Sequence, residues 1–381
     1  MTTLHDVALL RLAAQRLIGP GSPTAAETVR WMTATQAQDH TGALTSVALR
    51  TSAATRADVE AALDAGAIVK CWPMRGTLHL VAAEDLPWML ALLAPRVVAS
   101  STARRAGLGL TEPQLEQARD LTLTALAGGR RLRRADLLTV YNDAGLSTSG
   151  QRGVHILRFL AMTGTLVFGP TRDGEQLLVR TDEWITRPRH LHHDQALGEL
   201  ALRYFRSHGP ATVADFTRWA NLIAADVRTG LALARPKLTS LHLDRTEHLM
   251  DPRTPDLLNM ARAQAEGVLL LPGFDELLLG YNDRRAQLDP AFAERIVPGG
   301  NGVFRPTVLS AGRVVGTWTR TGRSGQQTIT ATPLTTFQPE VAAVIPRRYA
   351  ALRGREHDTR AEPRVSSQRS LGAALNADRA K

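Results

Sequence analysis

The sequence predicts an α+β fold, mostly α-helical, made of three tandem winged helix-turn-helix units and a small C-terminal β-rich unit. Three times along the chain, two or three helix-like segments precede two short strand-like segments joined by a turn. Helices followed by a hairpin are the order of a winged helix. After Gly267 the pattern changes to several short strands. With 381 residues, 44% of them hydrophobic, the chain can bury the cores of several domains.

The first unit is expected over residues 1–100, and its helix starts carry clear signals. Ser22 can cap a helix whose first turn holds Pro23, and Thr24 and Glu27 have the spacing of a capping box. Thr55 can cap the next helix. The expected elements are helices at Asp6 to Leu17, Pro23 to about Gln36 and Arg56 to Leu63, and strands at Ile68 to Trp72 and Thr77 to Val81.

The second unit is expected over residues 101–190, and its hairpin turns at Asp173-Gly174, a strong turn signal. Its expected elements are helices at Glu112 to Leu126, Arg134 to Ala144 and about Ser149 to Met162, and strands at Thr165 to Phe168 and Gln176 to Val179.

The third unit, residues 191–262, has a break at His208-Gly209-Pro210, after which Thr212 caps the next helix. Its expected elements are helices at Gln195 to Ser207, Val213 to Trp219 and Ala224 to Ala234, and strands at Lys237 to Leu243 and Glu247 to Met250.

The β-rich unit is expected over residues 263–353. Its expected elements are strands at Val268 to Pro272, Gly302 to Leu309, Arg313 to Thr319 and Gln326 to Thr330, and a closing helix at Pro339 to Leu352. Residues 354–381 are charged and poor in apolar side chains, so they are predicted to be a disordered tail.

Charge and composition narrow the class of partner. The net charge is +10, and only three of the 46 basic residues are lysines. This favours a polyanionic partner, since arginine forks fit phosphates and guanine edges, although codon bias in a GC-rich genome explains the arginines equally well. Cys71 is the only cysteine, and no apolar run approaches a membrane span. A cytoplasmic, nucleoid-associated protein is expected, without membrane contact.

Gln36 and Gln38 are the most informative residues. Val29, Met32 and Gln36 follow the spacing of one helix face, which places an amide at the end of an apolar stripe. A buried amide needs a partner, either protein or a water and a substrate. Residues two apart on a helix point about 200° apart, so both side chains can converge only if the helix ends near Gln36.

Other chemically interesting residues have simpler explanations. Arg75 at the tip of the first hairpin is placed to meet phosphate, whereas His79 is expected to be a satisfied core residue. Asp275 and Glu276 can act as general bases, but a loop with capped backbone amides is the favoured interpretation. The histidines of 190–193 lack a second ligand cluster, so no metal is expected. No P-loop, dinucleotide fingerprint or nucleophile elbow occurs, and no cofactor is expected.

Several short stretches together resemble the AlkZ/YcaQ family of bacterial winged-helix DNA glycosylases, over about residues 5–350. The stretches are Gln36-Ala37-Gln38, Trp72 to His79, Gly209 to Phe216, Leu271 to Asp275 with Gly280-Tyr281, and Gly302 to Pro306 with Gly316-Thr317-Trp318. The family pattern is Gln, an apolar residue, then Gln or Asp. Glutamine at both positions resembles the AlkZ-like branch.

The resemblance implies that Gln36 and Gln38 are catalytic, and that the protein protects its host against a DNA-alkylating natural product of the azinomycin B type. The implied partner is double-stranded DNA carrying alkylated purines or crosslinks, without an obligate protein partner. The family also engages DNA with a β-hairpin, which we expect at Val308 to Thr319. Arg75, Arg313 and Arg320 are the predicted DNA contacts.

The chemistry of an N7-alkylated guanine suits two amides. Such a base is cationic and leaves as a neutral species, so the enzyme needs to orient a water and stabilise an oxocarbenium-like sugar. Strand cleavage requires an amine, and Lys70 and Lys237 are the only lysines before the tail, so no lyase step is expected. A crosslinked guanine cannot flip freely, which predicts an open, arginine-lined channel. Two alternatives stay open, a non-enzymatic DNA-binding regulator and a protein-interaction module.

Overall fold

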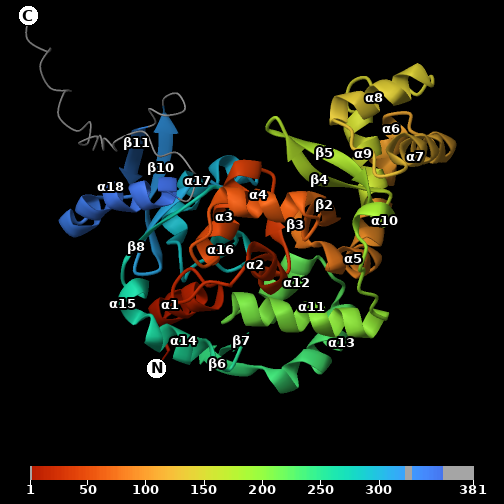
Figure 1. Ribbon diagram of the computed structural model, residues 1–381. Helices are drawn as coiled ribbons and strands as arrows, with labels where there is room; N and C mark the ends of the chain where they lie inside the picture. Colours follow the sequence, from red (N-terminus) through yellow and green to blue (C-terminus); the bar gives the residue numbers. More distant parts are fainter. Residues whose placement is uncertain (1, 322–327, 355–381) are drawn as a thin grey trace, which may run out of the picture.

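The computed structural model describes residues 2–321 and 328–354, and it confirms the predicted α+β, mostly α-helical fold. Helices dominate the molecule, and the strands form small antiparallel sheets (Figure 1). No helix in the described part of the chain is long and apolar enough to cross a membrane.

The first unit has one more helix than predicted. Its elements are α1 (Leu4–Ala14), α2 (Ala25–Met32), β1 (Thr35–Gln36), α3 (His40–Arg50), α4 (Arg56–Asp64), β2 (Ile68–Met74), β3 (Thr77–Ala82) and the 3₁₀ turn η1 (Ala83–Asp85). The predicted capping box is present between Thr24 and Glu27, so Ser22 is not the cap. The prediction that this helix reaches Gln36 is wrong, because Thr33 takes a positive φ of 70° and ends it four residues earlier.

The second unit has its three predicted helices and two predicted strands in order, together with three helices that were not predicted, the first of which lies before residue 101. Its elements are α5 (Leu86–Ser100), α6 (Thr102–Gly107), α7 (Glu112–Leu126), α8 (Arg134–Asp143), α9 (Arg152–Met162), β4 (Leu166–Arg172), β5 (Glu175–Arg180) and α10 (Thr181–Trp184). Asp173 and Gly174 both have positive φ, as the predicted tight turn requires.

The third unit begins with a long helix that ends at His208, where the Gly209-Pro210 break was predicted. Its elements are α11 (His193–His208), α12 (Val213–Ala220), α13 (Ala224–Ala234), η2 (Arg235–Lys237), β6 (Thr239–Leu243) and β7 (Thr246–Met250). Thr212 and Asp215 form a capping box at the start of α12, which fixes its entry angle.

The C-terminal part forms a four-stranded sheet closed by a helix. Its elements are α14 (Thr254–Met260), α15 (Arg262–Ala265), β8 (Val268–Leu271), α16 (Glu276–Leu279), η3 (Pro290–Phe292), α17 (Ala293–Ile296), η4 (Pro298–Gly300), β9 (Thr307–Ser310), β10 (Arg313–Thr321), β11 (Thr328–Pro333) and α18 (Pro339–Gly354). The strand predicted from Gly302 starts five residues later. Gln326 and Gln327 of the last predicted strand lie outside the described residues, as does the predicted tail after Gly354.

The first two hairpins join into one sheet, which the sequence did not predict. The strand order is β1-β3-β2-β4-β5, and the link between the units is the pair Lys70 and Phe168 (Figure 1). The C-terminal sheet has the order β11-β10-β9-β8, and β6 and β7 form a separate pair. The first unit is therefore anchored on the second through backbone pairing.

Packing does not follow chain order at the N-terminus. Leu9 and Leu12 of α1 share a core with Leu258, Leu271 and Leu277, about 250 residues later in the chain. This packing brings the loop after β8 against the first unit. The division of the chain into domains at residues 100, 190 and 262 remains a prediction.

Candidate active site

Gln36 and Gln38 lie on an extended segment beside the β2–β3 hairpin. Gln36 pairs with His79 in the sheet, and the amide of Ala37 donates to the carbonyl of Leu78 at 2.7 Å. Gln36 ends the strand β1 and Gln38 lies in the bend that follows, and both side chains contact the β2–β3 hairpin. Their convergence therefore comes from the pairing of this segment with β3, not from the last turn of a helix.

Both amide oxygens reach the same hairpin. Gln38 Oε1 accepts from the backbone N–H of Leu78 at 3.2 Å, and Gln36 Oε1 lies 3.5 Å from Nη2 of Arg75. Gln38 is exposed, whereas only 7% of Gln36 is accessible. Neither amide nitrogen has a hydrogen bond to any described residue, so both can donate to water or to a bound substrate.

Arg75 turns inward and contacts the protein. It adopts a φ of 52°, and its guanidinium donates to the carbonyl of Trp219 and lies 3.1 Å from Nε2 of His79. It also lies over the Trp219 ring. In this position Arg75 can fix the orientation of the Gln36 side chain. A contact between Arg75 and a DNA phosphate remains a prediction.

His79 is a core residue, as predicted. It is fully buried, and its Nδ1 lies 2.9 Å from the carbonyl oxygen of Thr77. Burial and the nearby charge of Arg75 lower the pKa of His79 to about 3, so the ring is neutral. It contacts Arg75 from strand β3 and takes no part in proton transfer at neutral pH.

Glu276 was named in the sequence as one of a pair of acids, but its contact with Gln36 was not predicted. Its side chain is fully buried, with Oε1 accepting from the backbone N–H of Gln36 and Oε2 from the indole N–H of Trp219, both at 3.2 Å. Nε2 of His208 lies 3.5 Å away. Burial alone would raise the pKa of Glu276, but the contact with His208 and the charge of Arg75 lower it to about 2. An ionised carboxylate therefore lies directly behind Gln36.

Asp275 caps backbone amides, which is the structural role that the sequence favoured for Asp275 and Glu276. It caps α16 by accepting from Leu277, and it forms a bidentate ion pair with the buried Arg50 at 2.7 and 2.9 Å. Ser46 donates to the same carboxylate. In the sequence, Glu276 stands out only because it directly follows the family-like stretch Leu271 to Asp275. Its contact with Gln36 depends on the fold.

Arg313 and Arg320 lie on the C-terminal sheet and not beside the glutamines. Arg313 borders a separate hollow of about 290 Å³, and Arg320 lies over the Trp318 ring at 5.8 Å. A Cβ at Gly312 would lie 3.2 Å from the backbone of Ala8, so the β9–β10 turn packs against α1. Engagement of DNA by the Val308 to Thr319 hairpin remains a prediction, and the contact with α1 leaves Ser310 and Ala311 of its turn half-buried. DNA contacts by Arg313 and Arg320 remain predictions.

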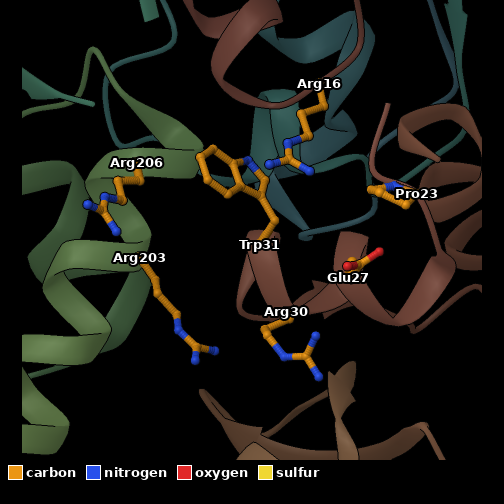
Figure 2. Close-up of a pocket in the computed structure, with 7 residues that line it drawn as sticks. All are labelled: Arg16, Pro23, Glu27, Arg30, Trp31, Arg203 and Arg206. Carbon is orange, nitrogen blue, oxygen red and sulfur yellow. The ribbon is translucent and has the colours of Figure 1, made fainter. Parts of the chain in front are cut away.

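An arginine-lined pocket of about 380 Å³ lies beside α2 and α11 (Figure 2). Arg16 stacks over the Trp31 ring at 4.1 Å. The other three arginines form ion pairs: Arg30 with Glu84, Arg203 with Asp85 and Arg206 with Asp251. Because these charges are compensated, the pocket offers a polyanion little attraction.

Comparison with known proteins identifies the family. Residues 29–355 match the family model described as DNA glycosylase AlkZ-like. The chain belongs to the AlkZ-like DNA glycosylase family. It is 27% identical over 322 residues to an interstrand DNA cross-link repair glycosylase of Streptomyces sahachiroi, covering 81% of this chain and 85% of the relative. The solved structure of Streptomyces sahachiroi DNA glycosylase AlkZ has a TM-score of 0.78 at 24% identity, covering 96% of this chain and all of that chain.

Membership of the AlkZ-like family confirms the resemblance drawn from the sequence. The protein is a DNA glycosylase, an enzyme that hydrolyses N-glycosyl bonds. A non-enzymatic regulator is no longer a competing hypothesis. The Gln36-Ala37-Gln38 segment and Glu276 both lie within the matched residues.

Proposed function

We propose that this glycosylase releases N7-alkylguanine from duplex DNA and unhooks interstrand crosslinks, with Gln36 and Gln38 as its catalytic residues. The supporting observation is that both amide oxygens converge on the Arg75–Leu78 hairpin while both amide nitrogens stay open to a ligand. A non-enzymatic scaffold would bury and pair both amides.

We assign the two glutamines different roles in the reaction. Gln36 is held through its backbone by Glu276 and through its side chain by Arg75, so its amide is preorganised to orient the attacking water. Gln38 is exposed, so it can meet the sugar or the water from the solvent side. Each amide oxygen has a second lone pair besides the one that accepts from the hairpin, and that lone pair can accept from the attacking water or face an oxocarbenium-like sugar and stabilise its charge without proton transfer.

The substrate preference follows from what amides cannot do. Neither glutamine is an acid or a base near neutral pH, so neither can protonate a departing base. An uncharged purine would have to leave as an anion, which is a poor leaving group. An N7-alkylated guanine already carries its positive charge, so orientation of water is sufficient help. The exposed side of Gln38 leaves room for a bulky or crosslinked adduct, which agrees with the description of the Streptomyces relative.

We further propose self-resistance to an azinomycin B-type alkylating product as the physiological role. The support is the glutamine at both motif positions together with the relative's crosslink-repair description. Expression in a sensitive host should raise survival under the agent, and the Gln36→Ala, Gln38→Ala double variant should not. Equal survival with both proteins would contradict the role.

Glutamine substitution tests the proposed function directly. Gln36→Ala or Gln38→Ala should slow single-turnover release of N7-methylguanine from duplex DNA on the order of a hundredfold, the cost of losing one preorganised dipole. DNA affinity and thermal stability should change little for Gln38→Ala. Gln117→Ala, an exposed glutamine on α7, is the matched control and should behave as wild type. Wild-type release by the double variant would refute the proposal, as would the absence of release from any N7-alkylated substrate by the unmodified enzyme.

A further inference from the structure

A cluster of cations on the second unit has no compensating acids. We call it the arginine track, and it consists of Arg96 on α5, Arg104 on α6, and Arg152 and Arg158 on α9, with the buried Arg105 of α6 beneath them. None of these side chains forms an ion pair with any residue in ranges 2–321 and 328–354. Elsewhere in the same unit, Arg133 and Arg180 are paired with carboxylates. Other arginines of the unit, such as Arg130 and Arg134, also bond only neutral acceptors or lie free of described carboxylates, so the position of the cluster beside the Arg75 hairpin is what distinguishes it.

The arginines of the track bond to neutral acceptors, which leaves their charges uncompensated. Arg96 donates to the carbonyl of Asn221 at 3.2 Å, Arg104 to the side chain of Gln151, and Arg152 to the carbonyl of Leu108. Partial burial and the charges of Arg158, Arg104 and Arg105 lower the pKa of His155. The groups are thus close enough to repel one another, which a bound polyanion would relieve.

The track begins at the candidate active site. A Cβ on Gly76 would lie 2.0 Å from Nη2 of Arg158, so that guanidinium lies against the hairpin turn next to Arg75. Two residues further along the hairpin, the backbone N–H of Leu78 donates to the side-chain oxygen of Gln38. The buried Nε of Arg158 has no hydrogen-bond partner among the described residues.

A second residue of the track also borders the site. Arg96 bonds the backbone of Asn221, two residues after Trp219, whose carbonyl holds Arg75. The track therefore flanks the glutamines and extends away from them over α5, α6 and α9, on the right side of the molecule in Figure 1.

We infer that the arginine track binds the phosphate backbone of the DNA arm next to the lesion. Phosphates bind where arginine charge is uncompensated, and bidentate arginine contacts fix the register of a duplex without reading its sequence. The paired arginines of the pocket in Figure 2 lack this property. The inference rests on the proposed function for its substrate and adds the surface that positions it.

The test replaces three track arginines whose side chains make at most one hydrogen bond each to described residues, so that their loss disturbs the fold little. The variant is Arg96→Gln, Arg104→Gln, Arg158→Gln, and the control is Arg133→Gln, Arg180→Gln, Arg235→Gln, which removes the same charge from ion-paired sites. Affinity for an undamaged duplex is measured across salt concentrations, and single-turnover excision is measured with saturating enzyme. Circular dichroism confirms that both triple variants are folded.

The track variant should bind the duplex at least about tenfold more weakly near physiological salt, and its salt slope should fall by roughly two to three. Because Arg158 lies against the hairpin turn of the site, excision at saturation is measured on the variant Arg96→Gln, Arg104→Gln, and should stay within about twofold of wild type. An unchanged slope, or an equal loss in the control, would overturn the inference. If the wild-type enzyme binds through the track but releases no N7-alkylated base, the proposed function fails and the inference about binding stands.

Discussion

At the scale of single residues, the site depends on Glu276 as much as on the glutamines that the motif reveals. A fully buried carboxylate is costly unless it is paired and hydrogen-bonded, and this one accepts from Gln36 and Trp219 and lies close to His208. The sequence showed the glutamines because their spacing was unusual. It singled out Glu276 beside Asp275 but could not place it against Gln36, since the contact joins residues 240 positions apart.

Replacing Glu276 by Gln should weaken the site while keeping its volume. One carboxylate oxygen becomes an NH₂ group facing an N–H donor, so we expect about 1–3 kcal/mol of lost stability at pH 7 and slower excision. The folded-state pKa of about 2 lies below the ordinary 4.5, so the carboxylate stabilises the fold above about pH 4.5 and loses this effect as pH falls toward 2.

Urea denaturation at pH 7 and pH 3 measures this difference. The gap in stability between wild type and Glu276→Gln should narrow at pH 3. Glu84→Gln, which breaks the half-exposed ion pair with Arg30, is the control and should cost less than about 1 kcal/mol. A gap that is equal at both pH values would show that Glu276 is not ionised in the folded protein.

At the scale of secondary-structure elements, local signals predicted most helices and hairpins and failed where pairing is non-local. Capping boxes at Thr24 and Thr212 and the Asp173-Gly174 turn placed their elements well. The sequence missed β1 and α3, because a two-residue strand is defined by its partner β3 rather than by its own pattern. That miss decided the geometry of the motif, since the strand, not the helix end, brings the glutamines together.

The register of the first sheet predicts a glycosylase without lyase activity. Lys70 pairs with Leu80, whereas Gln36 pairs with His79, so Lys70 and Gln36 point to opposite faces of the sheet. Burial lowers the pKa of Lys70 to about 8, which makes the amine more nucleophilic, but the sheet separates it from the glutamines. Lys237 is exposed in η2, at the start of the third hairpin.

Borohydride reduction during turnover checks this prediction. No covalent protein–DNA adduct should form, and Lys70→Met should excise at a rate within a few-fold of wild type if the fold survives. A trapped adduct that disappears in Lys70→Met would contradict the register argument. A trapped adduct that persists in that variant would contradict the hydrolytic mechanism and point to another amine.

At the scale of the whole molecule, the first helix holds the two ends of the chain together and so keeps Glu276 against Gln36. Arg11 of α1 is 1% exposed and donates to the carbonyl of Pro210 at 2.9 Å and to Gln287 at 2.7 Å. It also lies over the Tyr281 ring and 3.8 Å from the buried Asp215. One side chain thus links α1, the third unit and the loop that follows α16, the helix that carries Glu276.

Arg11→Met should therefore destabilise the whole protein and not just its N-terminus. The substitution keeps an apolar stem but leaves the buried Asp215 without its cation, which typically costs about 3–5 kcal/mol. The matched control is Arg30→Met, whose partner Glu84 is a third exposed, so its loss should stay below about 1 kcal/mol. Chemical denaturation followed by tryptophan fluorescence measures both. The expected loss requires that α1 and the site unfold as one cooperative unit. An unchanged denaturation midpoint together with faster proteolysis before residue 20 would mean that only α1 frays. That result would show that the first helix does not stabilise the site.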